Sequence, residues 1–142
     1  MTPHQVQLVE DSFRAVVPIR SAAAEIFYRR LFEIDPTLRS LFAATDMAEQ
    51  GSKLMASLGF VVQNLRRADE IVPAIQDLAR RHVGYGVQPD HYETVGAALI
   101  ETLREGLGES FCDETCDAWA AAYKLLSGVM REAQAQVSTR VA

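Results

Sequence analysis

Residues 71–87, IVPAIQDLARRHVGYGV, decide the fold because they combine a helical apolar stripe with a histidine. Side chains at steps of three and four residues share one face of a helix. The stripe consists of Ile71, Ile75, Leu78 and His82, at steps of four, three and four residues. Three of its members are aliphatic, so this face is the buried one, and its fourth member is an imidazole.

His82 has two interpretations at this position. A histidine near the C-terminal end of a helix is favourable simply because the helix dipole attracts positive charge there. An imidazole on a buried face can instead bind a metal through one nitrogen, while a carbonyl one turn earlier holds the other nitrogen. Leu78 would supply that carbonyl. The stripe alone leaves both interpretations open.

Helix signals continue on both sides of this stretch. Thr2 before Pro3 is a typical helix start, and Asp46 with Glu49 has the spacing of a capping box. The sequence contains no sustained alternation of apolar and polar residues, which is the pattern that would predict a strand. The predicted class is therefore all-α, with six or seven helices, while periodicity does not choose among helical topologies. The expected helices span residues 3–17, 19–34, 36–42, 46–65, 69–82, 89–106 and 113–137, with little or no helix between residues 43 and 46.

Length and charge limit the classes of function. A chain of 142 residues fits one domain, residues 1–142, with a core large enough to enclose a pocket. The net charge of −5 gives no electrostatic footprint for nucleic acid or anionic membranes. No stretch approaches the roughly 18 apolar residues of a membrane helix, and residues 1–10 lack a signal-peptide pattern. Cys112 and Cys116 are expected as free thiols, and together these features predict a cytoplasmic protein.

Two further polar residues stand on apolar faces. Gln50 begins a stripe that is otherwise apolar, and Tyr28 falls on the inner face of residues 19–34. Gln50 could be a solvated residue of a first helical turn, and Tyr28 a core tyrosine with a satisfied hydroxyl. Tyr28 could instead face an open metal coordination position and donate a hydrogen bond to a ligand bound there. The stripe of Gln50 continues with Leu54, Leu58, Val61 and Leu65.

Four stretches of the chain match a known family in their order and spacing. They are DSFRAV (residues 11–16), FYRRLF (27–32) with Asp35-Pro36 and Leu41-Phe42, QGSKLM (50–55), and ARRH (79–82) with YGV (85–87), His91-Tyr92 and Val95-Gly96; Ala118-Trp119 and AAY (121–123) fit as well. Together they resemble the globins over nearly the whole chain. The resemblance is greatest to single-domain bacterial haemoglobins and to the globin part of flavohaemoglobins, and neuroglobin is a more distant likeness. It implies a globin fold, with six to seven helices around a buried haem pocket.

The resemblance also implies a haem b cofactor, bound without covalent attachment because the chain has no Cys-x-x-Cys-His motif. His82 matches the proximal ligand of the iron, and Gln50 and Tyr28 match distal positions over its open face. Phe42 matches the phenylalanine that wedges the haem, and Tyr92 matches a tyrosine near the proximal histidine. Expected to line the pocket are Leu54, Val87, Val95 and Leu99, and expected to meet the haem propionates are Lys53 and Arg81, although each of these two could simply be solvated.

The function that the resemblance implies is reversible binding of dioxygen, CO and NO at a five-coordinate iron. Bound dioxygen carries partial negative charge, so a donor at Tyr28 or Gln50 favours it over carbon monoxide. Nitric oxide dioxygenation with a separate reductase is the alternative from the enzyme class, because a chain of this length holds no flavin or nicotinamide domain beside the core. A gas-sensing or signalling module is the third possibility. The bacterial relatives imply a monomer or a homodimer.

One position departs from the flavohaemoglobin pattern. In those proteins a glutamate late in the last helix joins the tyrosine that matches Tyr92, and the pair strengthens the donation of the imidazole to iron. The matching residue here is Gln134, and Glu132 falls on another helix face. A neutral amide is a weaker partner than a carboxylate. Oxygen activation or peroxidase chemistry of the flavohaemoglobin kind is therefore not expected.

Overall fold

The computed structural model describes residues 1–141, with side chains through residue 136. Within that part of the chain every regular element is helical, so the predicted all-α class is confirmed. The α-helices are α1 (Pro3–Val16), α2 (Arg20–Ile34), α3 (Met47–Gln63), α4 (Val72–Gly84), α5 (His91–Leu107) and α6 (Asp113–Val141). Four 3-10 segments join them: η1 (Val17–Ile19), η2 (Pro36–Phe42), η3 (Leu65–Ile71) and η4 (Gly108–Ser110). Residues 43–46 form no helix, as predicted.

The predicted helix starts have the expected local causes. Thr2 caps α1, and its hydroxyl accepts the backbone N–H of Gln5 while the Gln5 side chain accepts the backbone N–H of Thr2. Asp46 caps α3, since its carboxylate accepts from the backbone nitrogens of Ala48 at 3.0 Å and Glu49 at 3.2 Å. These bonds satisfy donors that the first turn of a helix leaves unpaired.

Several predicted helix ends differ from the structure by one to four residues. The helix expected from residue 69 begins at Val72, because Pro73 favours the first turn of a helix and residues 65–71 form η3 with a kink at Arg67. The helix expected from Pro89 begins at His91. The short helix expected over residues 36–42 is confirmed at those bounds and has 3-10 geometry. Helix α3 ends at Gln63 rather than near residue 65, and α6 continues beyond residue 137 to Val141.

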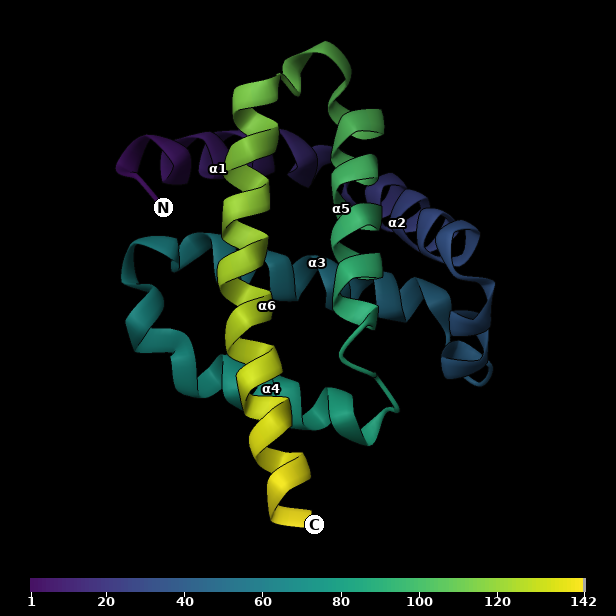
Figure 1. Cartoon of the computed structure of the whole chain (residues 1–142). Helices are drawn as coiled ribbons and strands as arrows, with labels where there is room; N and C mark the ends of the chain where they lie inside the picture. Colours follow the sequence, from purple (N-terminus) through teal and green to yellow (C-terminus); the bar gives the residue numbers. More distant parts are fainter. Residues whose placement is uncertain (142) are drawn as a thin grey trace.

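The helices cross in layers. Figure 1 shows α5 and α6 side by side and antiparallel, passing in front of α1, α3 and α4. The most extensive packing joins α2 to α5 and α4 to α6, while α3 rests mainly on α2. In contrast, α3 and α4 are not extensively packed against one another in the described part of the chain. The two helices that carry Gln50 and His82 are therefore held by different partners.

The buried apolar residues form two separate clusters within the described residues. The large cluster joins α1, α2, α3, α5 and α6 and includes Leu31, Leu99 and Trp119. The small cluster lies between α4 and α6, and consists of Ile71, Ile75, Ala79, Tyr92, Met130 and Ala133. Apolar side chains at the borders of these clusters are only partly buried, and they include Phe42, Leu54 and Val95 beside the large cluster and Leu78 and Val87 beside the small one.

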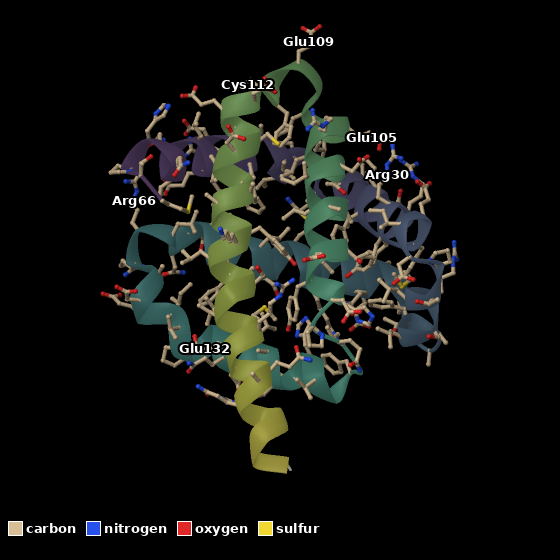
Figure 2. All side chains as sticks on the ribbon, in the orientation of Figure 1. Arg30, Arg66, Glu105, Glu109, Cys112 and Glu132 are labelled. Carbon is tan, nitrogen blue, oxygen red and sulfur yellow. The ribbon has the colours of Figure 1, made fainter. Side chains whose placement is uncertain are left out.

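Surface ion pairs fix α2 against α5. Glu105 accepts hydrogen bonds from Arg29 at 2.8 Å and from Arg30 at 3.0 Å, and Figure 2 shows Arg30 and Glu105 together at the edge of the molecule. These bonds lower the pKa of the Glu105 carboxyl below its usual value. The pairs are solvent-exposed, so their contribution to stability is modest, and the packing between α2 and α5 holds the helix that bears Tyr28.

A close approach between α2 and α3 requires glycine at position 51. A Cβ atom at Gly51 would lie 2.9 Å from the Cβ atom of Ala24, whereas one at Gly128 in α6 would meet nothing within 4 Å. Alanine at either position gains helix propensity, but only at Gly51 does it overpack the core, which typically costs about 1–3 kcal/mol. We therefore expect the free energy of unfolding of Gly51→Ala to be about 1–3 kcal/mol below that of Gly128→Ala in urea titrations. Equal stabilities would contradict the close approach.

Candidate functional site

The His82 imidazole is fixed by the backbone of its own helix. Its Nδ1 lies 2.8 Å from the carbonyl oxygen of Leu78. A carbonyl only accepts, so Nδ1 carries the hydrogen and donates it, and the lone pair is on Nε2. Burial lowers the pKa of His82 below its usual value, against the opposing effect of the Leu78 bond. The ring is thus neutral and oriented, which is the form that binds a metal.

Tyr28 and Gln50 meet across the α2–α3 contact. The amide Nε2 of Gln50 donates to the phenol oxygen of Tyr28 at 3.2 Å. Tyr28 is 8% exposed, and burial raises the pKa of its phenol. The phenol therefore stays protonated at neutral pH, and its own hydrogen remains to be donated to a third group. Gln50 is half-buried and bonded, so it is not merely a solvated residue of a first turn.

Three aromatic rings surround the ring of Tyr28. Its centroid lies 5.0 Å from that of Phe27, 5.5 Å from that of Phe42 and 6.2 Å from that of Phe32. Phe32 lies 5.7 Å from Phe42. Sequence reasoning gave Phe32 no role at the site. The sequence feature that could have identified Phe32 is its position four residues after Tyr28, which places the two side chains on one face of α2. The rings restrict the direction in which the Tyr28 hydroxyl points.

The four residues expected to line a pocket come from three separate parts of the chain. Leu54 lies on α3, Val95 and Leu99 on α5, and Val87 between α4 and α5. Leu99 is buried, while Leu54, Val87 and Val95 are half-buried. These partly covered side chains stand at the borders of the large and small clusters. The expected lining thus falls where the apolar core is incomplete.

The two cations expected to meet propionates are both on the surface. Arg81 is 59% exposed, and its guanidinium lies 3.7 Å from the Asp77 carboxylate. Lys53 is exposed on α3. Each is one residue from a residue of the expected pocket, His82 and Leu54 respectively. Their part in binding propionates stays a prediction.

Behind His82, the structure uses Gln134 differently from the pattern expected of flavohaemoglobins. Its amide Nε2 donates to the carbonyl of Val87 at 2.9 Å, and the Val87 N–H in turn donates to the carbonyl of His82 at 3.1 Å. The Tyr92 phenol and the Gln134 Oε1 are buried without hydrogen-bond partners among the described residues. Glu132 is exposed whereas Gln134 is buried, so the two lie on different faces of α6, as predicted, and Figure 2 labels Glu132 along this helix.

This Gln134–Val87 bond was not anticipated from the sequence, because it joins residues 47 positions apart. The bond ties the segment that follows α4, at Val87, to the last helix, α6.

Replacing Gln134 with leucine is expected to lower the free energy of unfolding by about 1–3 kcal/mol, because the carbonyl of the half-buried Val87 loses its donor. Gln136→Leu, at an exposed position two residues later on the same helix, is the matched control. Urea unfolding of both variants measures the difference. Equal effects would mean that the amide of Gln134 does not hold Val87 in solution.

The sequence and the fold both match known proteins. A family model described as Globin matches residues 25–130. The chain is 28% identical over 139 residues to a flavohemoprotein of Xylella fastidiosa (strain 9a5c), covering 96% of this chain and 34% of that protein. It is 31% identical over 132 residues to a flavohemoprotein of Bordetella parapertussis, covering 92% of this chain and 33% of that one. The chain therefore spans about a third of the length of these relatives.

Two solved structures extend the comparison. An engineered carbene transferase, a variant of a putative nitric oxide dioxygenase from Rhodothermus marinus, superposes with a TM-score of 0.88 at 28% identity, covering 99% of this chain and 98% of that chain. A bacterial globin from Campylobacter jejuni superposes with a TM-score of 0.85 at 21% identity, covering 97% of this chain and 99% of that chain, and shows the same fold. With a family match over residues 25–130 and this common fold, the chain belongs to the globin family.

Proposed function

We propose that this globin binds haem through His82 and takes up dioxygen and other diatomic gases on the side of Tyr28 and Gln50. The observation that carries the proposal is the half-buried, neutral imidazole whose Nδ1 is engaged by Leu78. That arrangement leaves Nε2 as the single protein nitrogen for an iron. The haem would be b-type, because no Cys-x-x-Cys-His sequence is available to attach it covalently.

The residues present fit a large, flat, mostly apolar group. The core is divided into the large and small clusters, and Leu54, Val87 and Val95 at their borders are only half-buried. A macrocycle between the clusters would cover these side chains, and burial of its apolar faces would supply binding energy. Arg81 and Lys53 would accompany the acidic propionates at the surface. Tyr92, a buried member of the small cluster, would contribute to the proximal wall.

When bound, haem would supply an iron with one open coordination position for a diatomic gas. Tyr28 would donate its free hydroxyl hydrogen to the gas, and the Gln50 amide would hold the phenol oxygen in position. Because Gln50 is already bonded to Tyr28, its side chain is not available as a sixth ligand in this arrangement. We therefore propose five-coordinate iron in the reduced protein. Phe42 and Phe32 would keep water from the phenol on this side.

Visible absorption spectra of the purified protein test this proposal. Spectra would be recorded for the ferric form, for the dithionite-reduced form, and for the reduced form under carbon monoxide. A sharp Soret band that shifts with carbon monoxide is expected, and the ferrous bands would have the shape of five-coordinate iron. The absence of a Soret band after reconstitution with excess haem would overturn the proposal. The chain would then serve a haem-free role on a globin fold.

Nitric oxide dioxygenation is the second candidate. Its support is the similarity to the variant of a putative nitric oxide dioxygenase of Rhodothermus marinus, 98% of which this chain covers. In that reaction dioxygen and nitric oxide combine to nitrate, and continued turnover needs electrons. The described residues are taken up by the globin helices, so we propose that a reductase outside these residues supplies the electrons.

Consumption of nitric oxide measures this second candidate directly. The protein would be mixed with a general flavin reductase and its nicotinamide substrate, and nitric oxide would be followed with an electrode. Sustained, dioxygen-dependent consumption is expected from an enzyme, and a single stoichiometric uptake from a simple binding protein. His82→Ala provides the background rate.

A further inference from the structure

Two free thiols lie together where α6 begins. Cys112 directly precedes this helix, and Cys116 lies one turn into it. The backbone N–H of Cys116 donates to the carbonyl of Cys112 at 2.9 Å, so the first turn of the helix joins the two residues. Figure 1 shows this end of α6 on the opposite side of the molecule from α4. The pair therefore stands apart from the proposed iron ligand.

The thiol of Cys112 combines exposure with a hydrogen-bond donor. Cys112 is exposed, so a small oxidant can reach its sulfur, and Figure 2 labels it at the surface. Its Sγ lies 3.3 Å from the hydroxyl oxygen of Thr115. The hydrogen bond from this hydroxyl, aided by backbone N–H groups of the first turn, lowers the pKa of the Cys112 thiol below its usual value. The thiolate is the nucleophilic form of cysteine, so this environment makes Cys112 more reactive than an ordinary exposed thiol.

The thiol of Cys116 is covered by a neighbouring helix. Cys116 is half-buried and packs against the large cluster. The guanidinium of Arg104 in α5 donates to its Sγ at 3.8 Å and stands over the Phe111 ring, 5.7 Å from the ring centroid. The two thiols are thus unequal, because an oxidant meets Cys112 first, while Cys116 is held one turn away as its partner.

The spacing of the two cysteines allows a disulfide within the observed fold. A helical rise of about 1.5 Å per residue places Cα atoms four positions apart at about 6 Å. Disulfides usually join residues whose Cα atoms are about 4.4–6.8 Å apart, so this separation is within range. Closing the bond then requires rotation of the two side chains rather than a new helix position.

We propose that Cys112 and Cys116 form an oxidation-sensitive dithiol that a hydroperoxide converts to an intrachain disulfide, with the Thr115 hydroxyl assisting the Cys112 thiolate. The inference goes beyond gas binding and does not depend on haem. The disulfide would be reversible, because exposed disulfides are readily reduced by other thiols. Its formation would withdraw the Cys112 sulfur from Thr115 and the Cys116 sulfur from Arg104, so the change falls on the turn between α5 and α6.

The oxidation has two steps. The Cys112 thiolate attacks one oxygen of hydrogen peroxide, the O–O bond breaks, and the products are a sulfenic acid and a hydroxide ion, which the proton released by the Cys112 thiol converts to water. The sulfur of Cys116 then attacks the sulfur of Cys112. An S–S bond forms, the S–O bond breaks, and the hydroxyl leaves as water with the proton of the Cys116 thiol. In total, two thiols and one hydrogen peroxide give one disulfide and two water molecules.

Oxidation of the whole chain by hydrogen peroxide tests the dithiol. The protein would be exposed to a small excess of peroxide, treated with a thiol-alkylating reagent, and analysed by intact-mass spectrometry. The sequence contains no cysteine besides these two, so a reduced chain takes up two alkyl groups and a disulfide-bonded chain takes up none. Loss of both alkyl groups from the monomeric chain is expected, and dithiothreitol should restore them.

Single serine variants separate the two steps. Cys116→Ser should stop at the sulfenic acid of Cys112, which dimedone would trap as a mass adduct. In Cys112→Ser, the remaining thiol of Cys116 should be oxidised at least several-fold more slowly than Cys112 is in the other variant. Both substitutions lie outside the candidate haem site, so a reaction of peroxide with haem would affect the two variants equally.

Thr115→Val tests the assisting hydroxyl. Thr115 is buried, and valine removes its hydroxyl at nearly constant volume, so the first oxidation step should slow several-fold. Thr102→Val is the matched control, since it makes the same change at a buried threonine whose hydroxyl donates to the carbonyl of Ala98. Its oxidation rate should equal that of the unaltered protein.

Three results would overturn the proposal. One is oxidation of Cys112 and Cys116 at the same slow rate in the two serine variants. Another is a disulfide between two chains in place of the intrachain bond, seen as a dimer without reductant. The third is an equal oxidation rate in Thr115→Val and Thr102→Val. If Thr115→Val does not fold, the two serine variants still decide the outcome.

Discussion

Replacing His82 with alanine is expected to abolish the stable haem complex. The imidazole would be the one ligand that the chain supplies to the iron, and its orientation depends on the 2.8 Å bond to Leu78. Loss of a partner that merely orients a metal ligand costs about 10–100-fold in metal affinity, and loss of the ligand itself should cost more. The measurement is the Soret band after haem titration and gel filtration, together with the response of the reduced form to carbon monoxide.

His91→Ala is the control for this experiment. His91 is also at a helix boundary, but its ring accepts the backbone N–H of Gln88 at 2.9 Å and so stabilises the turn that precedes α5. That variant should retain the full Soret band. A normal, carbon monoxide-sensitive spectrum in His82→Ala would move the iron ligand to another residue and remove the main support for the proposed function.

Replacing Tyr28 with phenylalanine is expected to raise the dioxygen dissociation rate by about 10- to 150-fold, with a much smaller effect on carbon monoxide. The range follows from the roughly 1.5–3 kcal/mol of a hydrogen bond to a charged acceptor. Dioxygen in the distal pocket carries more negative charge than carbon monoxide, so it loses more when the hydroxyl is removed. Stopped-flow displacement of each gas measures the two rates.

Tyr85→Phe makes the same chemical change on an exposed side chain, 64% accessible, and should alter neither rate. Equal changes for dioxygen and carbon monoxide in Tyr28→Phe would exclude the phenol as a selective donor. The aromatic packing of the ring would remain in that variant, because Phe32 and Phe42 contact the ring rather than its hydroxyl. A rate change would therefore report the hydrogen bond rather than a collapsed pocket.

Local rules accounted for most of the helix positions. Thr2 and Asp46 carry their capping signals in the adjacent residues, and the structure forms the capping bonds at both. The start of α4 was misplaced because the apolar stripe already includes Ile71, although the chain there is still 3-10. Hydrophobic periodicity does not distinguish three residues per turn from 3.6 over so short a segment.

The candidate site likewise has residues that local patterns predicted and a contact that they could not predict. His82, Tyr28 and Gln50 each interrupt or continue an apolar stripe within one helix, α4, α2 and α3 respectively, so the sequence alone singled them out. The structure brings Tyr28 and Gln50 into contact. The Gln134–Val87 bond depends on how α6 crosses the end of α4, which no local pattern encodes. The assignment of haem to these residues came from the family resemblance rather than from periodicity.

With haem bound as we propose, the divided core would make the conformational stability of this globin depend on the supply of its cofactor. A ligand that binds only the native state shifts the folding equilibrium by mass action, by about 4 kcal/mol when its free concentration is about 1,000 times its dissociation constant. Without such a ligand, α4 would rest chiefly on the small cluster against α6. Segments with few buried contacts open locally at low free energy and are the first that proteases and chaperones recognise. Haem availability would thereby set how long each newly made chain survives in the cell.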